Sequence, residues 1–189
     1  NAGGVFGANA VTSDPAQSAA ANYAFKEAAY AGLGSFGSTA GSATWTMVDG
    51  STRPFLQGEW QPVISNAHQL QLMRLAPDAD YVLGGPTWRS AIDAGETGRF
   101  DGTAGHAGGM WAQAGFVPVG DAATAFSGNL DGQGHTIDAL AMNRPDAANA
   151  GLFGVIGLGA TVRDLVLAVP DIDGGNVNGA NFGTLAGTS

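Results

Sequence analysis

Asp131 and His135 are residues whose types suit acid–base or metal chemistry, and they lie four positions apart. They belong to the stretch FSGNLDGQGHTIDAL, residues 126–140, where a carboxylate beside an imidazole could act as a general base or a metal ligand. The same letters also predict a corner, with Asp131 and Gly132 in a turn and Gly134 at a positive φ between two short strands. A spacing of four does not by itself bring the two side chains together. We therefore favour the corner, with Asp131 accepting hydrogen bonds from turn amides.

A polar, glycine-rich segment, residues 89–111, predicts a loop that projects from the fold. Exposed loops on a rigid scaffold often carry binding residues. Trp88 and Trp111 bracket this loop, and two indoles beside acidic groups could stack on a sugar ring while the polar groups bind its hydroxyls. The alternative is that both indoles pack under the loop, which we favour for Trp111 because the apolar AGFVPVG follows it. The possible ligand-loop residues are Trp88, Asp93, Glu96, Asp101, His106 and Trp111.

Metal and cofactor motifs are weak in this sequence. The segment VPDIDGGNVNG, residues 169–179, has the oxygen-rich composition of a Ca²⁺ loop, but it lacks the D-x-D-x-D-G spacing and an acidic residue at the twelfth position. Turns rich in Gly and Asn produce the same composition. There is no H-E-x-x-H, Walker loop, dinucleotide fingerprint or Ser-His-Asp order. We expect no catalytic residue, no bound metal and no cofactor.

The composition indicates one domain of an acidic protein. The 189 residues are 44% hydrophobic and carry a net charge of −9, and Lys26 is the single lysine. The sequence therefore lacks the basic cluster that nucleic-acid binding needs, and its charge disfavours an anionic membrane surface. Glycine contributes 31 residues interleaved with Val, Leu, Ile and Phe, which predicts many short strands separated by tight turns. With no cysteine, the sequence leaves the redox compartment open.

Two segments in the N-terminal part predict short helices. The Ala-rich residues 14–33 begin with Asp14 as a candidate N-cap, followed by Pro15. Residues 65–75, SNAHQLQLMRL, have a candidate cap at Ser65 or Asn66 and apolar residues at helical spacing. From residue 81 onward, short apolar runs alternate with Gly, Asn and Asp, which predicts strands.

An internal repeat connects two of these strand segments. GHTIDALAM, residues 134–142, aligns with GATVRDLVL, residues 159–167, at an offset of 25. A period of this length with Gly and Asn at the corners predicts an all-β fold, a parallel β-solenoid in which each turn stacks on the last. In that arrangement Ile137 lies over Val162, Leu140 lies over Leu165, and all four point inward. A two-sheet sandwich is less consistent with a fixed offset.

The motifs also resemble a known family. FSGNLDGQGHTIDAL, GLFGVIGLGATVRDLVL and GTLAG, together with WTMVDGSTRPFL at residues 45–56, resemble the GLUG-type repeat region of filamentous-haemagglutinin-like bacterial surface adhesins. The resemblance covers roughly residues 41–189 and implies a right-handed parallel β-helix. On this basis residues 1–56 end one repeat module with an Ala-rich helical insertion, and residues 57–189 start the next GLUG-type module.

We therefore expect a segment of a secreted or surface-displayed bacterial adhesin, cut from a longer array, with a structural role and no enzymatic one. The expected location is extracellular or on the bacterial cell surface. The expected partners are a surface glycan or protein receptor, and neighbouring repeats of the same chain or a homo-oligomeric filament formed head to tail. The alternative is a polysaccharide-binding or polysaccharide-cleaving β-helix protein, which a cluster of Asp131, Asp138, Asp164 and Arg163 would favour.

Overall fold

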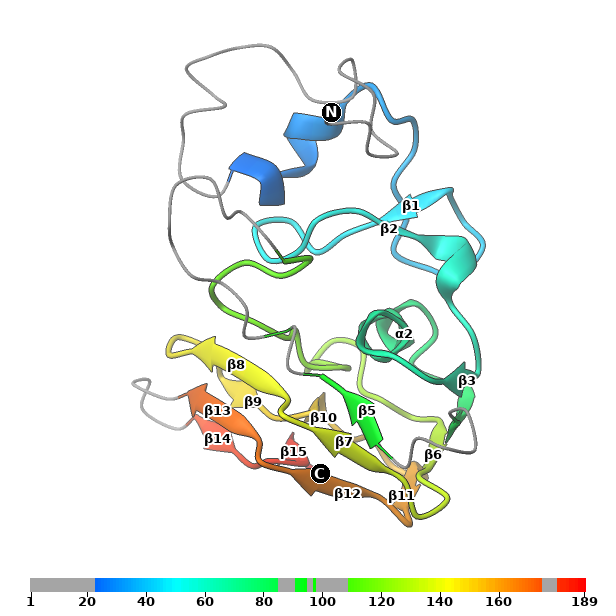
Figure 1. Cartoon of the computed structure of the whole chain (residues 1–189), viewed down its shortest axis with the longest axis vertical. Coiled ribbons are helices and arrows are strands. Elements are labelled where there is room, and N and C mark those ends of the chain that lie inside the picture. The colour runs from blue at the N-terminus through cyan, green and yellow to red at the C-terminus, as the bar shows by residue number, and fades with distance from the viewer. Residues whose placement is uncertain (1–22, 85–90, 95–96, 98–108, 175–179) are drawn as a thin grey trace.

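The computed structural model describes residues 23–84, 91–94, 97, 109–174 and 180–189, which form mostly strands with one short α-helix (Figure 1). The helical elements are η1 (Tyr23–Phe25), η2 (Glu27–Tyr30), η3 (Gln57–Glu59), α2 (Ala67–Leu72) and η4 (Met73–Leu75), where η marks a 3₁₀-helix. The all-β prediction is confirmed at this level, and the strand pairings from β3 onward are parallel.

The strands are short, with two to four residues each. In chain order they are β1 (Trp45–Thr46), β2 (Phe55–Leu56), β3 (Val63–Ile64), β4 (Asp80–Leu83), β5 (Ala91–Asp93), β6 (Asn129–Asp131), β7 (Thr136–Asp138), β8 (Ala141–Arg144), β9 (Asn149–Ala150), β10 (Phe153–Val155), β11 (Thr161–Arg163), β12 (Val166–Ala168), β13 (Asp171–Gly174), β14 (Asn181–Phe182) and β15 (Ala186–Thr188).

The predicted helix over residues 14–33 is wrong in its described part, because residues 23–30 form two separate 3₁₀-helices. Lys26 between them has an extended backbone, with φ −105° and ψ 129°. The Phe25 carbonyl accepts a hydrogen bond from Gly50 N, and Glu27 N donates to the Asp49 carboxylate. These contacts with the 49–50 turn replace the bonds that an α-helical ladder would need. Residues 14–22 lie outside the described part.

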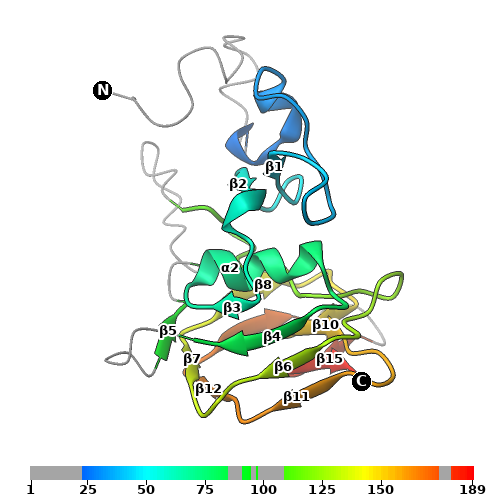
Figure 2. The same cartoon turned by 90° about the vertical axis from the view of Figure 1, so that its right-hand side faces the viewer.

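The helix predicted over residues 65–75 is confirmed as α2 followed by η4. Asn66 is the N-cap, and its side chain accepts a hydrogen bond from Gln69 N at 2.9 Å. The face that carries Leu70 and Met73 is fully buried. Both views place this helix over the end of the molecule that holds β3 and β4, opposite the end that holds β11 and β12 (Figure 2).

β1 and β2 form a separate antiparallel sheet that pairs Trp45 with Leu56 and Thr46 with Phe55. The predicted module boundary after residue 56 falls between this sheet and η3, and the division into modules stays a prediction.

From β6 to β15 the chain makes two successive passes through the same set of strands. β6, β7, β8, β9 and β10 pair in parallel with β11, β12, β13, β14 and β15, respectively. Thr161 lies beside Asn129, 32 residues earlier, and Val166 lies beside Thr136, 30 residues earlier. β4 and β5 extend two of these ladders by pairing with β6 and β7.

The 25-residue offset predicted from the sequence is therefore wrong. Ile137 lies beside Leu167, and Val162 lies beside Leu130 in a different sheet. The reason is a difference in turn length. Four residues, 132–135, separate β6 from β7, whereas only residues 164 and 165 separate β11 from β12. The sequence alignment matched residues of similar type, although the turns between the strands differ in length.

The core follows these pairings. Inward side chains of the earlier pass, including Leu130, Ile137 and Phe153, are fully buried. Their neighbours in the later pass, including Val162 and Leu167, are only partly buried and pack against the same core cluster. Burial therefore decreases from the α2 end toward the last strands.

Corner residues with left-handed backbone recur at matching places. Ala139 (φ 57°) follows β7, and Val169 (φ 44°) occupies the equivalent place after β12. Ala139 N donates to the Ala168 carbonyl at 2.9 Å, which links the two corners. Gly134 has φ 75°, so the positive φ predicted there is confirmed. A branched side chain such as Val169 is strained in this region, where Gly would not be.

Candidate functional site

The predicted ligand loop is only partly described by the structure. Trp88, Glu96, Asp101 and His106 lie outside the described residues. Asp93 belongs to β5, where its backbone lies beside Asp138 of β7. These ligand-loop assignments stay predictions, apart from that of Trp111.

Trp111 packs in the core. Its side chain is 1% exposed, and its indole Nε1 donates to Gln71 Oε1 at 2.8 Å. The ring makes edge contacts with Phe55 and His68, each at 5.7 Å between centroids. The indole N–H is therefore satisfied by a hydrogen bond, and the indole ring is packed against other aromatic rings of the protein. Trp111 does not offer a free face to a sugar, in agreement with the packing interpretation and against its inclusion among the ligand residues.

Three long polar side chains hold the segment that follows Trp111. Gln71 Nε2 donates to the Val117 carbonyl and Gln71 Oε1 accepts from Val117 N, both at 2.9 Å. Arg74 donates to the Pro118 carbonyl. Arg144 donates from Nε to Phe116 O at 2.8 Å and from Nη2 to Gly115 O at 3.0 Å. We name residues 115–118 the clamped segment, because α2, η4 and β8 fix its carbonyls through these side chains.

The two arginines of this clamp are electrostatically unusual. Burial and, to a smaller extent, the positive charge of Arg74 together lower the pKa of Arg144 to about 10. Burial also lowers the pKa of Arg74, while the Asp121 carboxylate partly offsets that effect. Carbonyl oxygens satisfy guanidinium donors without neutralising their charge. The clamp therefore keeps positive charge close to a cavity on the same side of the molecule.

That cavity has a volume of about 750 Å³ and lies where residues 38–55 face the turn at residues 120–127. Its lining mixes four carboxylates, the guanidinium of Arg74 and six hydroxyl side chains. These residues are Glu27, Asp49, Asp78, Asp121, Arg74, Ser38, Thr39, Thr46, Thr52, Thr124 and Ser127. Carboxylates, a guanidinium and hydroxyls together can bind a polyhydroxylated ligand, because its hydroxyls both donate and accept hydrogen bonds.

Two of these carboxylates have defined structural contacts. Asp121 Oδ1 accepts from Ala123 N and Thr124 N, at 2.9 and 2.8 Å, and so closes the 121–124 turn. Asp49 accepts from Glu27 N at 2.8 Å and forms a 3.5 Å ion pair with Lys26. The backbone around the cavity is therefore fixed in part by its own acidic lining.

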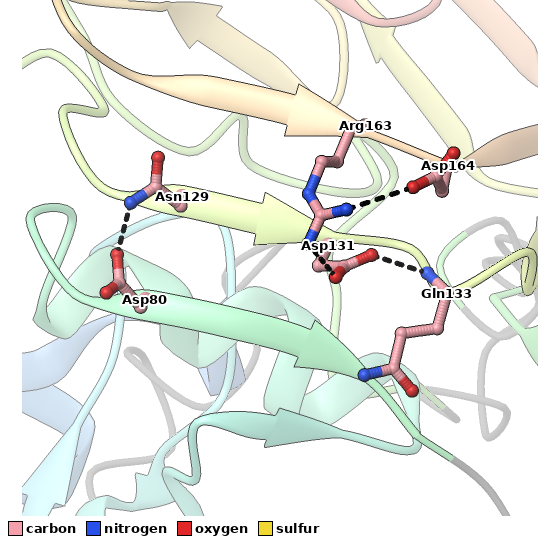
Figure 3. Close-up of polar contacts among 6 residues, drawn as sticks. All are labelled: Asp80, Asn129, Asp131, Gln133, Arg163 and Asp164. Carbon is pink, nitrogen blue, oxygen red and sulfur yellow. Dashed lines mark hydrogen bonds and ion pairs between the residues drawn. The ribbon is translucent and has the colours of Figure 1, made fainter.

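The corner at Asp131 is a separate polar cluster on the outside of the strands (Figure 3). Asp131 Oδ1 accepts from Gln133 N at 2.9 Å, which is the turn-amide contact predicted from the sequence. Its Oδ2 forms an ion pair with Arg163 of the neighbouring strand β11. Arg163 also contacts Asp164 at 3.3 Å. The side chains of Arg163 and Asp164 are both 61% exposed.

Only part of the acidic cluster that would favour a polysaccharide-acting protein forms. Asp131, Arg163 and Asp164 meet, whereas no described contact joins Asp138 to them or His135 to Asp131. The contacts of Asp131 explain its place in the corner, and screened ion pairs of this exposure contribute little stability. Within the part of the chain that the structure describes, no three His, Asp or Glu side chains are arranged to hold a metal ion. Asp171 and Asp173 lie in β13, and residues 175–179 of the predicted Ca²⁺ loop lie outside that part.

The clamp residues were missed by sequence reasoning. Gln71 and Arg74 lie in the apolar run LQLMRL, and isolated polar residues in such a run are the available signal. Their partners lie 40 to 46 residues later in the chain, so no local pattern identifies them.

Two curated proteins are similar to part of the chain. Halomucin from Haloquadratum walsbyi is 43% identical over 75 residues, which cover 39% of this chain and 1% of halomucin. A protein described as a Gly-rich membrane protein, from Evansella cellulosilytica, is 37% identical over 82 residues, which cover 40% of this chain and 10% of that protein. The chain thus spans a small share of both relatives.

No family model matches the chain, and no solved structure matches it significantly. The resemblance to GLUG-type adhesin repeats therefore stays a prediction. Among the residues that the structure describes, no helix has the length and apolar character needed to cross a bilayer.

Proposed function

We propose that the chain is a right-handed parallel β-helix segment of a secreted or surface-displayed bacterial adhesin, with a structural role as a stalk or display scaffold. In this role the chain extends outward from the cell surface and displays other parts of the protein. It needs no cofactor and catalyses no reaction. Its partners are a glycan or protein receptor on a host or bacterial surface, and neighbouring coils of the same chain or of further copies.

The observation that carries this proposal is the pairing of five consecutive strands, β6 to β10, with the next five, β11 to β15. A sandwich of two sheets does not require each strand to pair with the strand one pass later. A coil requires it, because each turn can bury its apolar face only against the next. Such coils are long and stiff, which suits a stalk.

The composition and the relatives support a location outside the cell. The chain combines a net charge of −9 with a single lysine, which keeps the surface acidic. One relative is named a halomucin and another is described as a membrane protein. These names fit a cell-surface location for this chain as well, and we extend them to it as part of the proposal.

Antibodies against the chain test the location. They should label intact cells of the producing organism without permeabilisation. Labelling that appears only after permeabilisation would contradict surface display. Incubation with acidic polysaccharides and Ca²⁺ tests the structural role, because product formation that Asp131→Ala abolishes would favour the cleaving enzyme instead.

A second function, saccharide binding, is favoured by the cavity of about 750 Å³. Its hydroxyls, carboxylates and Arg74 offer both donors and acceptors to a neutral sugar. We expect glucose, galactose or N-acetylglucosamine to bind there in calorimetric titrations. Thr39→Trp, which fills the exposed rim of the cavity, should weaken binding at least tenfold.

The matched control is Thr161→Trp, an exposed threonine of β11 that does not line this cavity. Equal affinities for both tryptophan variants would place the saccharide elsewhere. No heat of binding for any of the three sugars would reject the cavity as a site for neutral monosaccharides.

A further inference from the structure

The cavity of about 750 Å³ contains a buried hydroxyl group that has no partner in the described part of the chain. Thr46 of β1 lines this cavity and is only 8% exposed. No described residue forms a hydrogen bond with its side chain. Its oxygen is not fully enclosed by protein atoms, so it faces the cavity. Because buried hydroxyls are almost always hydrogen-bonded, this one points to a ligand in the cavity.

Apolar side chains lie at the same depth of the cavity. Phe55, Leu72 and Leu75 line it and are 2 to 4% exposed, and we name these three residues and Thr46 the cavity floor. Sites that bury a small molecule typically combine an apolar lining with a few polar groups, in a volume of about 300 to 1,000 Å³. The floor therefore suits a ring that has both C–H groups and hydroxyls, as a pyranose has.

The exposed part of the lining carries an excess of negative charge. Asp49 is paired with Lys26, and Asp121 lies close to a guanidinium of the clamp. Glu27 and Asp78 are exposed and line the same cavity, but neither carboxylate forms an ion pair or a hydrogen bond with any described residue. Charges of one sign in a cleft raise the local concentration of ligands of the opposite sign. The lining therefore favours a ligand that carries positive charge.

We propose that this cavity selects an amino sugar with a free, protonated amine, such as glucosamine, over its N-acetylated form. The inference rests on the saccharide binding proposed for the same cavity. The ring hydroxyls bond to Thr46 and Arg74, and the C–H groups of the ring pack against Phe55. The ammonium group donates to Glu27 or Asp78, whose carboxylates act only as acceptors. N-acetylation removes the charge and with it the charge-assisted hydrogen bond, which is stronger than a neutral one.

Calorimetric titrations with glucosamine and N-acetylglucosamine test this selectivity, because the two sugars differ only in the acetyl group. At about pH 6, where amines are protonated and carboxylates are in general ionised, glucosamine should bind at least about fivefold more tightly. The preference should shrink in about 1 M salt, which screens exposed charges. Glu27→Gln combined with Asp78→Asn should bring the two affinities within about twofold of each other.

Asp146→Asn combined with Asp171→Asn is the matched control, because it removes the same charge from exposed residues that do not line the cavity. It should leave the preference unchanged. Thr46→Val should weaken the binding of both sugars at least about threefold without lowering the Tm, since it removes no hydrogen bond within the described part of the protein.

Three results would overturn the amino-sugar selectivity and leave saccharide binding itself standing. They are equal affinities for the two sugars, a preference for glucosamine that survives in the Glu27 and Asp78 double variant, and an unchanged affinity of Thr46→Val. Binding of neither sugar would reject both the selectivity and the proposed saccharide site.

Discussion

Replacing Gln71 by methionine should strongly destabilise the protein, because Gln71 satisfies three buried polar groups at once. Its Oε1 accepts from Trp111 Nε1 at 2.8 Å and from Val117 N at 2.9 Å, and its Nε2 donates to Val117 O at 2.9 Å. Trp111 and Val117 are 1% and 7% exposed, so water does not readily replace the amide.

Methionine has a similar length but provides none of these three hydrogen bonds. Leaving a buried donor or acceptor unsatisfied costs about 1 to 3 kcal/mol for each group. The free energy of unfolding should therefore fall by roughly 3 kcal/mol or more, a large part of the total stability of a domain. Urea denaturation followed by tryptophan fluorescence measures this loss from the shift of the midpoint.

Gln113→Met is the control, because Gln113 is exposed and lies near the same segment. It should change stability by no more than about 0.5 kcal/mol. A loss below about 1 kcal/mol for Gln71→Met, or equal losses for both variants, would refute the argument that Gln71 fixes the clamped segment.

Other substitutions test the backbone strain at Val169, the difference in burial between Leu130 and Leu167, and the ionisation of Tyr81. Val169→Gly should stabilise the protein by about 1 kcal/mol in thermal denaturation, because it relieves a branched residue at φ 44° in an 80% exposed position; destabilisation would argue against strain there. Leu130→Ala should cost about 2 to 5 kcal/mol and Leu167→Ala clearly less, since only Leu130 is fully buried; equal losses would contradict the difference in burial between the two strand passes. Burial raises the pKa of Tyr81 to about 12, so the unfolded chain releases this proton from about pH 10 and the folded chain holds it until about pH 12. The stability that this group contributes is thus present below pH 10 and lost as pH rises through 12, and Tyr81→Phe should flatten that loss in denaturation curves recorded between these values.

Local signals in the sequence predicted the local structure well. Asn66 and the apolar spacing after it defined α2, because a cap and an amphipathic face are properties of adjacent residues. Gly134 and Asp131 defined a corner for the same reason. The Ala-rich helix failed because Phe25 and Glu27 bond to a turn more than 20 residues later, which helix propensity does not include.

The register of the strands was not predictable from the sequence match between the two repeat segments. The turn before β7 has four residues and the turn before β12 has two. The best sequence alignment of the two repeats therefore differs from the pairing of their strands. The clamp was also hidden, since Gln71 meets Val117 across 46 residues. Trp111 was the exception in this region, because its apolar neighbours already indicated that it packs inward.

The strand register of the proposed coil is tested most directly by paired cysteines in this cysteine-free chain. Asn129 and Thr161 are exposed neighbours on β6 and β11, and adjacent strands lie about 4.8 Å apart, within the range of Cα separations that a disulfide spans. Asn129→Cys with Thr161→Cys should therefore form an intramolecular disulfide under mild oxidation. Thr136→Cys with Thr161→Cys, the pair that a 25-residue offset would bring together, should stay reduced. A disulfide in the second pair and none in the first would contradict the coil.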